Sequence, residues 1–348
     1  MTTPLAPLSV LFVGGTGTIS SACVRRAVAA GMTVTVLNRG RNAQRRDLPD
    51  GVEWITADVT DPSSVASAID GRRFDAVASF LCFTGADARW AVDVFTGHTA
   101  QYLHISTASL YAKPVLQVPI VESTPRGNAY VAYSRQKIEA EDVFLDAHAD
   151  RGFPVTIVRP SHTYDEASPP LPGGWTIVDR MLRGDDIVVH GDGTSLWTVT
   201  HADDFALGFV GLIGNPRAVG ETFHITSDDV YNWEQIYLMV GAAFGVRPKL
   251  VHLPSEFFVL GAPEWGWSEL LMGDLGHSAI FDNTKIRRFV PGYAPTQTLH
   301  RSLRRMVRWR EEHPELARGD AEAEAVFDRM AAGYHRARAL FAPDGASA

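Results

Sequence analysis

The sequence of 348 residues predicts an α/β protein, with a doubly wound parallel sheet followed by a smaller C-terminal lobe. Two observations lead to this prediction. Short apolar runs alternate with helical patterns through the first half of the chain, as in the βα units that build a parallel sheet. The first apolar run also leads directly into a glycine-rich turn and a helical pattern, which is typical of nucleotide-binding sheets.

The apolar runs and helical patterns can be assigned in order along the chain. The expected strands are Val10–Val13, Thr33–Leu37, Val52–Thr56, Asp75–Phe80, Gln101–Ile105 and Val155–Val158. The expected helices are Thr18–Ala30, Pro62–Ile69, Ala86–Phe95 and Tyr130–Ala149, each long enough for a right-handed crossover. Strands joined in this way form a Rossmann-type sheet, in which ligands bind at the carboxyl ends of the strands.

The character of the sequence changes after Pro160. Pro, Gly, Trp and His cluster through Ser161–Trp175, and loops on a rigid scaffold commonly carry specificity. Further on, Leu299–Leu340 has a helical pattern that Pro314 interrupts. The expected division is a nucleotide-binding domain over residues 8–160 and about 199–228, and a substrate-binding lobe over residues 161–198 and 229–342.

Composition and charge limit the class of protein. A net charge of -8 argues against a nucleic-acid partner, because a phosphate-binding surface needs an excess of Lys and Arg. The only cysteines, Cys23 and Cys82, lie in apolar stretches and cannot form a disulfide framework, which indicates a reducing compartment. No apolar stretch approaches the ~20 residues of a membrane span, and no signal peptide is visible. We expect a cytoplasmic protein that binds a small-molecule substrate and no membrane.

The glycine-rich turn has the spacing GxxGxxS instead of GxGxxG, with Ser20 where a third glycine would stand. It lies between the first strand and the first helix, where a dinucleotide pyrophosphate approaches backbone amides at a helix N-terminus. The residues that we expect to bind the cofactor here are Gly14, Gly15, Thr16, Gly17, Thr18 and Ile19.

The end of the second strand bears on the choice between NADP and NAD. Asn38 and Arg39 stand where an enzyme that prefers NAD commonly places an acidic residue, and a guanidinium can pair with a 2'-phosphate. NADP is therefore favoured over NAD, unless Arg39 is only solvated or stacks on adenine. Asp58 and Val59, after the third strand, are expected to meet the adenine; alternatively, Asp58 caps the helix that begins at Pro62.

A tyrosine and a lysine form the expected proton-transfer pair. Tyr133 and Lys137 are four residues apart in a predicted helix and therefore share one face. A nearby positive charge favours phenolate, so the tyrosine could exchange a proton with a substrate hydroxyl near neutral pH. The alternative is structural, with Tyr133 as a half-buried core aromatic and Lys137 as a surface ion-pair partner of Glu141.

Taken together, the ordered motifs identify a family resemblance. GGTGTIS, ISTASLY, YSRQK and VRPSHTY follow successive elements, and they are joined by Gly191–Gly193, by the His201–Asp204 segment and by Phe281–Lys285. The series covers roughly residues 9–300 and resembles the extended short-chain dehydrogenase/reductases, in their NAD-dependent epimerase/dehydratase branch. Members of this family have a Rossmann fold, and we expect a homodimer.

The resemblance implies a catalytic triad. Counting back from Tyr111 places its hydroxyl residue at Thr107, with Ser106 and Ser109 beside it. In this scheme Thr107 hydrogen-bonds the reacting oxygen, Tyr133 is the acid/base, and Lys137 holds the nicotinamide ribose while lowering the tyrosine pKa. The positions expected to line the nicotinamide side are Phe80, Leu81 and Pro160, and Ser106 is also expected to bind the cofactor. The alternative for the hydroxyl cluster is a simple strand-end cap.

One departure from the family bears on the substrate. Trp197 lies in the segment where members that use nucleotide sugars carry an arginine, and an indole cannot pair with a diphosphate. This favours a smaller, aromatic or uncharged polyol-like substrate. Ser109, His162 and Trp197 are the expected substrate contacts. The histidines show no metal-ligand spacing, so no metal is expected.

These observations favour an NAD(P)-dependent oxidoreductase of the epimerase/dehydratase type. It would act at a carbinol or ketone carbon of a sugar-like or other small polyhydroxylated substrate. One alternative is an NADPH-dependent ketone reductase of specialised metabolism. The other is a catalytically inactive protein on the same fold that senses NADP or binds RNA. The presence of both Tyr133 and Lys137 and the acidic charge favour an enzyme.

Overall fold

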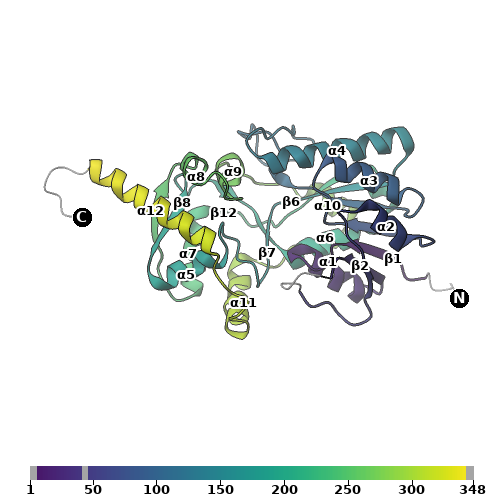
Figure 1. Ribbon diagram of the computed structural model, residues 1–348, viewed down its shortest axis with the longest axis horizontal. Coiled ribbons are helices and arrows are strands. Elements are labelled where there is room, and N and C mark those ends of the chain that lie inside the picture. Colours follow the sequence, from purple (N-terminus) through teal and green to yellow (C-terminus); the bar gives the residue numbers. More distant parts are fainter. Residues whose placement is uncertain (1–5, 41–45, 342–348) are drawn as a thin grey trace.

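A computed structural model describes residues 6–40 and 46–341 (Figure 1). It confirms an α/β fold with a central parallel sheet, drawn at one end of the long axis, and a second group of elements at the other end. Residue 342, the last of the predicted lobe, lies outside the described residues. None of the helices in the described ranges combines the length and the apolar character needed to cross a membrane.

The central sheet has seven strands in the order β11-β6-β5-β4-β1-β2-β3, and every neighbouring pair is parallel. The strands are β1 (Ser9–Val13), β2 (Thr33–Asn38), β3 (Glu53–Thr56), β4 (Ala76–Ser79), β5 (Tyr102–Ile105), β6 (Val155–Pro160) and β11 (Thr222–Ile225). All six strands expected from the sequence are present, with ends that differ by at most two residues. The order reverses at β1, which places a binding crevice at the carboxyl edge beside this strand.

Side chains of β1 alternate between two apolar layers because a strand has a period of two. Val10 and Phe12 join one core cluster, while Leu11 and Val13 join another on the opposite face. The first layer includes α1 (Thr18–Ala29), α6 (Ala202–Leu212) and α10 (Thr284–Phe289); the second includes α2 (Pro62–Ile69), α3 (Gly85–Phe95) and α4 (Ala132–Arg151). The sheet is therefore covered on both faces, as a parallel sheet requires.

A third apolar cluster holds the remaining elements together. It is rich in buried tryptophans, including Trp175, Trp197 and Trp233. The strands here form three two-stranded sheets: β7 (His162–Tyr164) with β10 (Val199–His201), β9 (Leu196–Trp197) with β12 (Tyr231–Asn232), and β8 (Asp186–His190) with β13 (Lys249–Leu253). The helices are α5 (Trp175–Arg183), α7 (Trp233–Ala243), α8 (Glu256–Gly261), α9 (Ser268–Leu270), α11 (Leu299–Glu312) and α12 (Ala321–Phe341).

A buried ion pair joins β6 to α4. Arg159 donates from Nε and Nη2 to the two carboxylate oxygens of Glu141, at 2.8 and 2.6 Å. Its Nη1 donates to the hydroxyl of Tyr111 at 2.8 Å. Both charged side chains are almost fully buried, at 4% and 0% exposed. Bidentate pairing of this kind fixes orientation as well as distance, so the pair sets how α4 lies on the sheet.

Replacing Glu141 with Ala should destabilise the protein by about 3–5 kcal/mol, because Arg159 would be left buried without its counter-ion. The matched control is Asp142→Ala, which removes a half-exposed carboxylate from the same helix. That change should cost about 1 kcal/mol or less. Urea unfolding followed by circular dichroism measures both. Equal losses for the two variants would show that the Arg159–Glu141 pair does not hold the helix.

Candidate active site

A cavity of about 810 Å³ runs along the carboxyl edge of the central sheet. Residues at the ends of β1, β2, β4, β5 and β6 contribute to its wall, together with one face of α4 and part of the second lobe. Of the residues expected from the sequence, those that line it are Gly14, Thr16, Gly17, Thr18, Ile19, Asn38, Arg39, Val59, Phe80, Leu81, Ser106, Thr107, Ser109, Tyr133, Lys137, Pro160, His162 and Trp197. Gly15 and Asp58 do not.

The glycine-rich turn needs two of its glycines for different reasons. Gly14 has a φ of +82°, and a Cβ there would stand 2.6 Å from Cγ of Leu81. Gly15 is needed for packing, since a Cβ would lie 2.8 Å from Val36. Its role in packing the turn on the sheet is thus clear, and its predicted role in cofactor binding stays a prediction. Gly17 caps α1, whose first turn leaves backbone N–H groups without partners inside the helix.

Arg39, just after β2, lines the cavity. Asp58 lies beside it but is not part of the cavity lining. The guanidinium lies 3.9 Å from the Asp58 carboxylate, with 56% of the Arg39 side chain exposed. Asp58 accepts hydrogen bonds from Thr60, and Val59 alone of the predicted pair faces the cavity. The alternative role of Asp58 as a helix cap is wrong, because Asp61 caps α2; its contact with adenine stays a prediction.

Lys137 is buried and is held by backbone carbonyls. Its Nζ donates to the oxygens of Cys82 and Ile105, at 2.6 and 2.8 Å, and lies 4.7 Å from the centre of the Phe83 ring. The surface ion pair with Glu141, considered from the sequence, is not formed; Glu141 pairs with Arg159 instead. Burial lowers the pKa of Lys137 to about 8. An ammonium group has three N–H bonds, so one remains for a ligand in the cavity.

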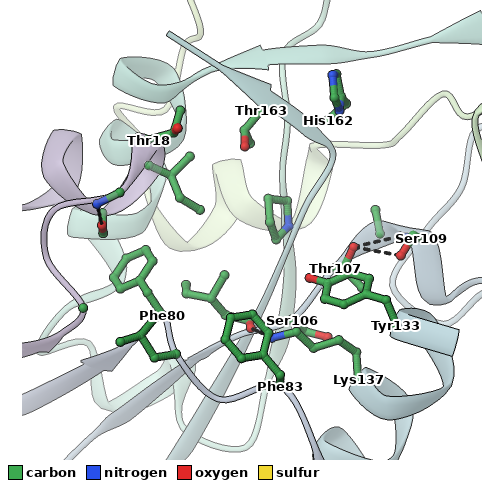
Figure 2. Close-up of a pocket in the computed structure, with 18 of the residues that line it drawn as sticks. Thr18, Phe80, Phe83, Ser106, Thr107, Ser109, Tyr133, Lys137, His162 and Thr163 are labelled. Atoms are coloured by element: carbon green, nitrogen blue, oxygen red, sulfur yellow. Dashed lines mark hydrogen bonds between the residues drawn. The ribbon is translucent and has the colours of Figure 1, made fainter. Parts of the chain in front are cut away.

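Tyr133 and Thr107 meet at the cavity wall (Figure 2). The hydroxyl of Thr107 accepts a hydrogen bond from the backbone N–H of Ser109 and so caps a short helical turn, Ala108–Leu110. Thr107 therefore also acts as a cap at the end of the strand. Burial raises the pKa of Tyr133 to about 12, although a hydrogen bond with Thr107 opposes this rise. The sequence had predicted a lowered pKa caused by Lys137. For the protein by itself the direction is the opposite, because burial of the phenol raises its pKa and the charge of Asp274 adds to the rise.

A dinucleotide cofactor fits this wall of the cavity. Buried polar atoms normally find a hydrogen-bond partner, yet the hydroxyl of Ser106 has none among the described residues and lies in the cavity wall. The unpaired amides at the start of α1 suit a pyrophosphate. Arg39, Ser106 and Lys137 would then hold the cofactor along this wall.

The second lobe closes the other end of the cavity. Trp197 lines it, but the indole N–H is already used, since it donates to the carbonyls of Leu275 and His277 at 3.0 and 2.9 Å. His162 stands edge-on to Trp267, and burial lowers the pKa of this histidine to about 4, so its ring is neutral. The lining residues that sequence reasoning missed include Phe83, Ser161, Thr163, Trp267, Leu270, Asp274 and Leu275.

Four of the missed residues come from one segment, Trp267–Leu275, that carries no recognisable motif. It is docked on the start of α4 by contacts that only the fold reveals. Glu269 accepts from the backbone N–H of Ala132 at 2.7 Å, and Asn128 donates to the carbonyl of Gly273 at 2.9 Å. A Cβ at Gly273 would lie 2.4 Å from Cβ of Tyr130. The tight approach holds the segment against the start of the helix that carries Tyr133.

The charges around the cavity are few. Among the described residues that line it, Arg39, Lys137 and Asp274 carry a formal charge. Arg39 belongs to the adenosine end, so the substrate end has one ammonium and one carboxylate. No group of three or more His, Cys, Asp or Glu side chains in the described part of the chain is arranged to hold a metal ion.

Comparisons with known proteins agree with this geometry. The model of the NAD dependent epimerase/dehydratase family matches residues 10–94 and 89–226. The chain is 26% identical over 291 residues to 2'-dehydrokanamycin reductase from Streptomyces kanamyceticus, covering 82% of this chain and 80% of the relative. It is 25% identical over 267 residues to chloroplast stem-loop binding protein of 41 kDa b from Arabidopsis thaliana, covering 71% and 67%.

Among solved structures, the dTDP-glucose 4,6-dehydratase DesIV from Streptomyces venezuelae, with NAD and TYD bound, superposes with a TM-score of 0.70. The sequence identity is 20%, and the match covers 88% of this chain and 98% of that one. At this identity the likeness shows a common fold.

If Lys137 gives its remaining N–H to a cofactor, the affinity for NADPH should depend on pH. Lys137 is charged below its pKa of about 8 and neutral above it, so binding should weaken as the pH rises past this value. The limit is about tenfold per pH unit. Fluorescence titrations of NADPH between neutral and alkaline pH measure the effect. A Lys137→Met variant should bind more weakly and lose this pH dependence; an unchanged profile in the variant would assign the effect to another group.

Proposed function

Since the chain belongs to the NAD dependent epimerase/dehydratase family, an NAD(P)-dependent group of enzymes, we propose that it is an NADPH-dependent reductase of a ketone on a sugar-like substrate without a nucleotide. The observation that carries the proposal is the cavity itself. One wall offers a dinucleotide site that ends at Tyr133, Thr107 and Lys137. The opposite wall includes Trp197 and Trp267 and offers no arginine among its described residues.

When NADPH is bound it would supply hydride to the ketone carbon, while residues of this chain supply the proton and hold the ketone oxygen. With a pKa of about 12, Tyr133 keeps its proton at neutral pH, which is the form needed to protonate the alkoxide as it develops. Thr107 lies beside the phenol and orients it together with the substrate oxygen. Lys137 stays in place through the carbonyls of Cys82 and Ile105 and holds the ribose next to the tyrosine.

Charge and shape favour a substrate without a diphosphate. Nucleotide-sugar recognition needs cations at the substrate end, because phosphates are bound mainly by charge-assisted hydrogen bonds. Trp197 lies in the segment where nucleotide-sugar enzymes of the family carry an arginine. Its buried N–H already has partners, so it offers no donor to a phosphate. A relative that matches most of this chain is named 2'-dehydrokanamycin reductase. This supports reduction of a ketone carried by a glycoside.

A second candidate is self-regenerating epimerase or dehydratase chemistry, which the names of other relatives favour. The two candidates differ in the fate of the cofactor. A reductase consumes NADPH in proportion to product, whereas an epimerase or dehydratase restores its cofactor in every cycle. Purified protein that retains cofactor through chromatography, and that turns over without added NADPH, would favour the second candidate.

Tyr133→Phe should lower turnover of a keto-glycoside by about 10²–10⁴, the usual worth of a positioned general acid, while NADPH binding stays near the level of the unmodified protein. The probes are 2'-dehydrokanamycin and methyl α-D-ribo-hexopyranosid-3-ulose, with loss of NADPH absorbance as the readout. Tyr130→Phe is the control, because it removes a phenol from an exposed tyrosine outside the cavity. Full turnover in Tyr133→Phe would remove this residue from the mechanism.

Arg39 should decide between the two cofactors. A guanidinium facing a 2'-phosphate is worth about 1.5–3 kcal/mol, or one to two powers of ten in affinity, and NAD cannot use it. Arg39→Ala should therefore weaken NADPH much more than NADH in calorimetric titrations. Arg25→Ala, an exposed arginine on α1, controls for the change in net charge. NADH bound more tightly than NADPH by the unmodified protein would contradict the assignment.

A further inference from the structure

Asp274 is a carboxylate held at the substrate end of the cavity. It lies in the segment Leu271–Leu275, and its side chain is 6% exposed. The neighbouring carbonyl of Leu275 accepts from the indoles of Trp197 and Trp233, both at 3.0 Å. These bonds fix the backbone next to Asp274. A carboxylate with so little exposure is normally paired or fully hydrogen-bonded. A partner is therefore expected for each of its two oxygens.

One oxygen of Asp274 faces a buried cation. Lys113 Nζ lies 2.9 Å from Asp274 Oδ1, and the lysine side chain is 0% exposed. The two atoms form a salt bridge, and neither has a further hydrogen-bond partner among the described residues. For the second oxygen, Oδ2, the described part of the chain provides no hydrogen-bond donor, although Asp274 lines the cavity. A purely structural ion pair has no need for an acceptor that is left open to a cavity.

The surroundings of Asp274 suit the ring of a carbohydrate. Trp197 and Trp267 line the same end of the cavity and present aromatic surface. The apolar C–H faces of a pyranose pack on such surfaces, while its hydroxyls need polar acceptors. Asp274 is also close enough to Tyr133 for its charge to help raise the pKa of the phenol. Because Asp274 and Tyr133 line the same cavity, one ligand can contact both.

We propose that Asp274, held by Lys113, is the substrate-binding carboxylate of this site, and that it accepts a hydrogen bond from a hydroxyl or ammonium group near the reacting carbon of an unphosphorylated glycoside. The placement of the reacting carbon rests on the proposed reductase function; the binding of the donor group does not. Lys113 balances the negative charge, so a neutral hydroxyl is accepted as well as an ammonium.

The test compares matched glycosides on the NADPH-loaded protein. Ligand-observed NMR titrations give Kd values for methyl α-D-glucopyranoside, for its 2-, 3-, 4- and 6-deoxy analogues, and for the amino-deoxy analogue at any position that proves sensitive. At least one deoxy analogue should bind about tenfold to a hundredfold more weakly than the parent glycoside, the usual effect of losing a hydrogen bond to a charged group. A tighter amino analogue would identify the ammonium as the preferred donor.

The Asp274→Asn variant should lose this discrimination, so that the parent and the sensitive deoxy analogue bind alike. The control is Asp192→Asn, in an exposed loop outside the cavity, which should still bind the parent glycoside more tightly than the sensitive deoxy analogue. If Asp274→Asn does not fold, the double variant Lys113→Gln/Asp274→Asn removes both charges together and serves instead, with circular dichroism as the check of folding.

Three results would overturn the proposal: equal affinities for all the glycosides in the unmodified protein, no binding of any of them, or unchanged discrimination after the substitution. The reductase function is judged separately, by NADPH consumption with methyl α-D-ribo-hexopyranosid-3-ulose. Binding that depends on Asp274 without consumption of NADPH would leave the inference standing and reject the proposed reaction.

Discussion

The ammonium group of Lys137 is the contact on which the site depends. It joins α4 to the carbonyls that follow β4 and end β5, at 2.6 and 2.8 Å. These strands come from different βα units, so a single side chain fixes α4 to the ends of two neighbouring strands of the sheet. Burying an ammonium is costly unless its donors are used, and here the carbonyls use two of them. The site is thus built around an ammonium group that keeps one N–H bond for a ligand in the cavity.

The residues close together in sequence could be predicted, because their geometry is local. The turn from Gly14 to Gly17 follows a buried strand and opens a helix, and Tyr133 and Lys137 share one helical face. Both patterns fix the positions of side chains without knowledge of the fold. Their environment could not be predicted in the same way. The pKa of Tyr133 depends on burial by elements far along the chain, and its direction was therefore predicted incorrectly.

The substrate end illustrates why the remaining residues were missed. Asp274 and Trp267 belong to a segment without a motif, more than a hundred residues after Tyr133 in the sequence. Their position follows from contacts with Asn128 and Ala132 that no local pattern encodes. Trp197 shows the converse case. Its place at the cavity was expected, but its indole N–H belongs to the carbonyls of Leu275 and His277, so only its ring surface is offered to a ligand.

The docking of the Trp267–Leu275 segment separates two tasks between neighbouring residues. Glu269 and Gly273 attach the segment to the start of α4, whereas Trp267, Leu270 and Asp274 face the cavity. The side chains that face the cavity are different from the residues that make the attachment, so the facing positions can change to suit another substrate while the attaching contacts are kept. Change at Gly273 is different, because any side chain there would collide with Tyr130. Specificity can therefore diverge in this segment by point mutation, without insertion or rearrangement of the chain.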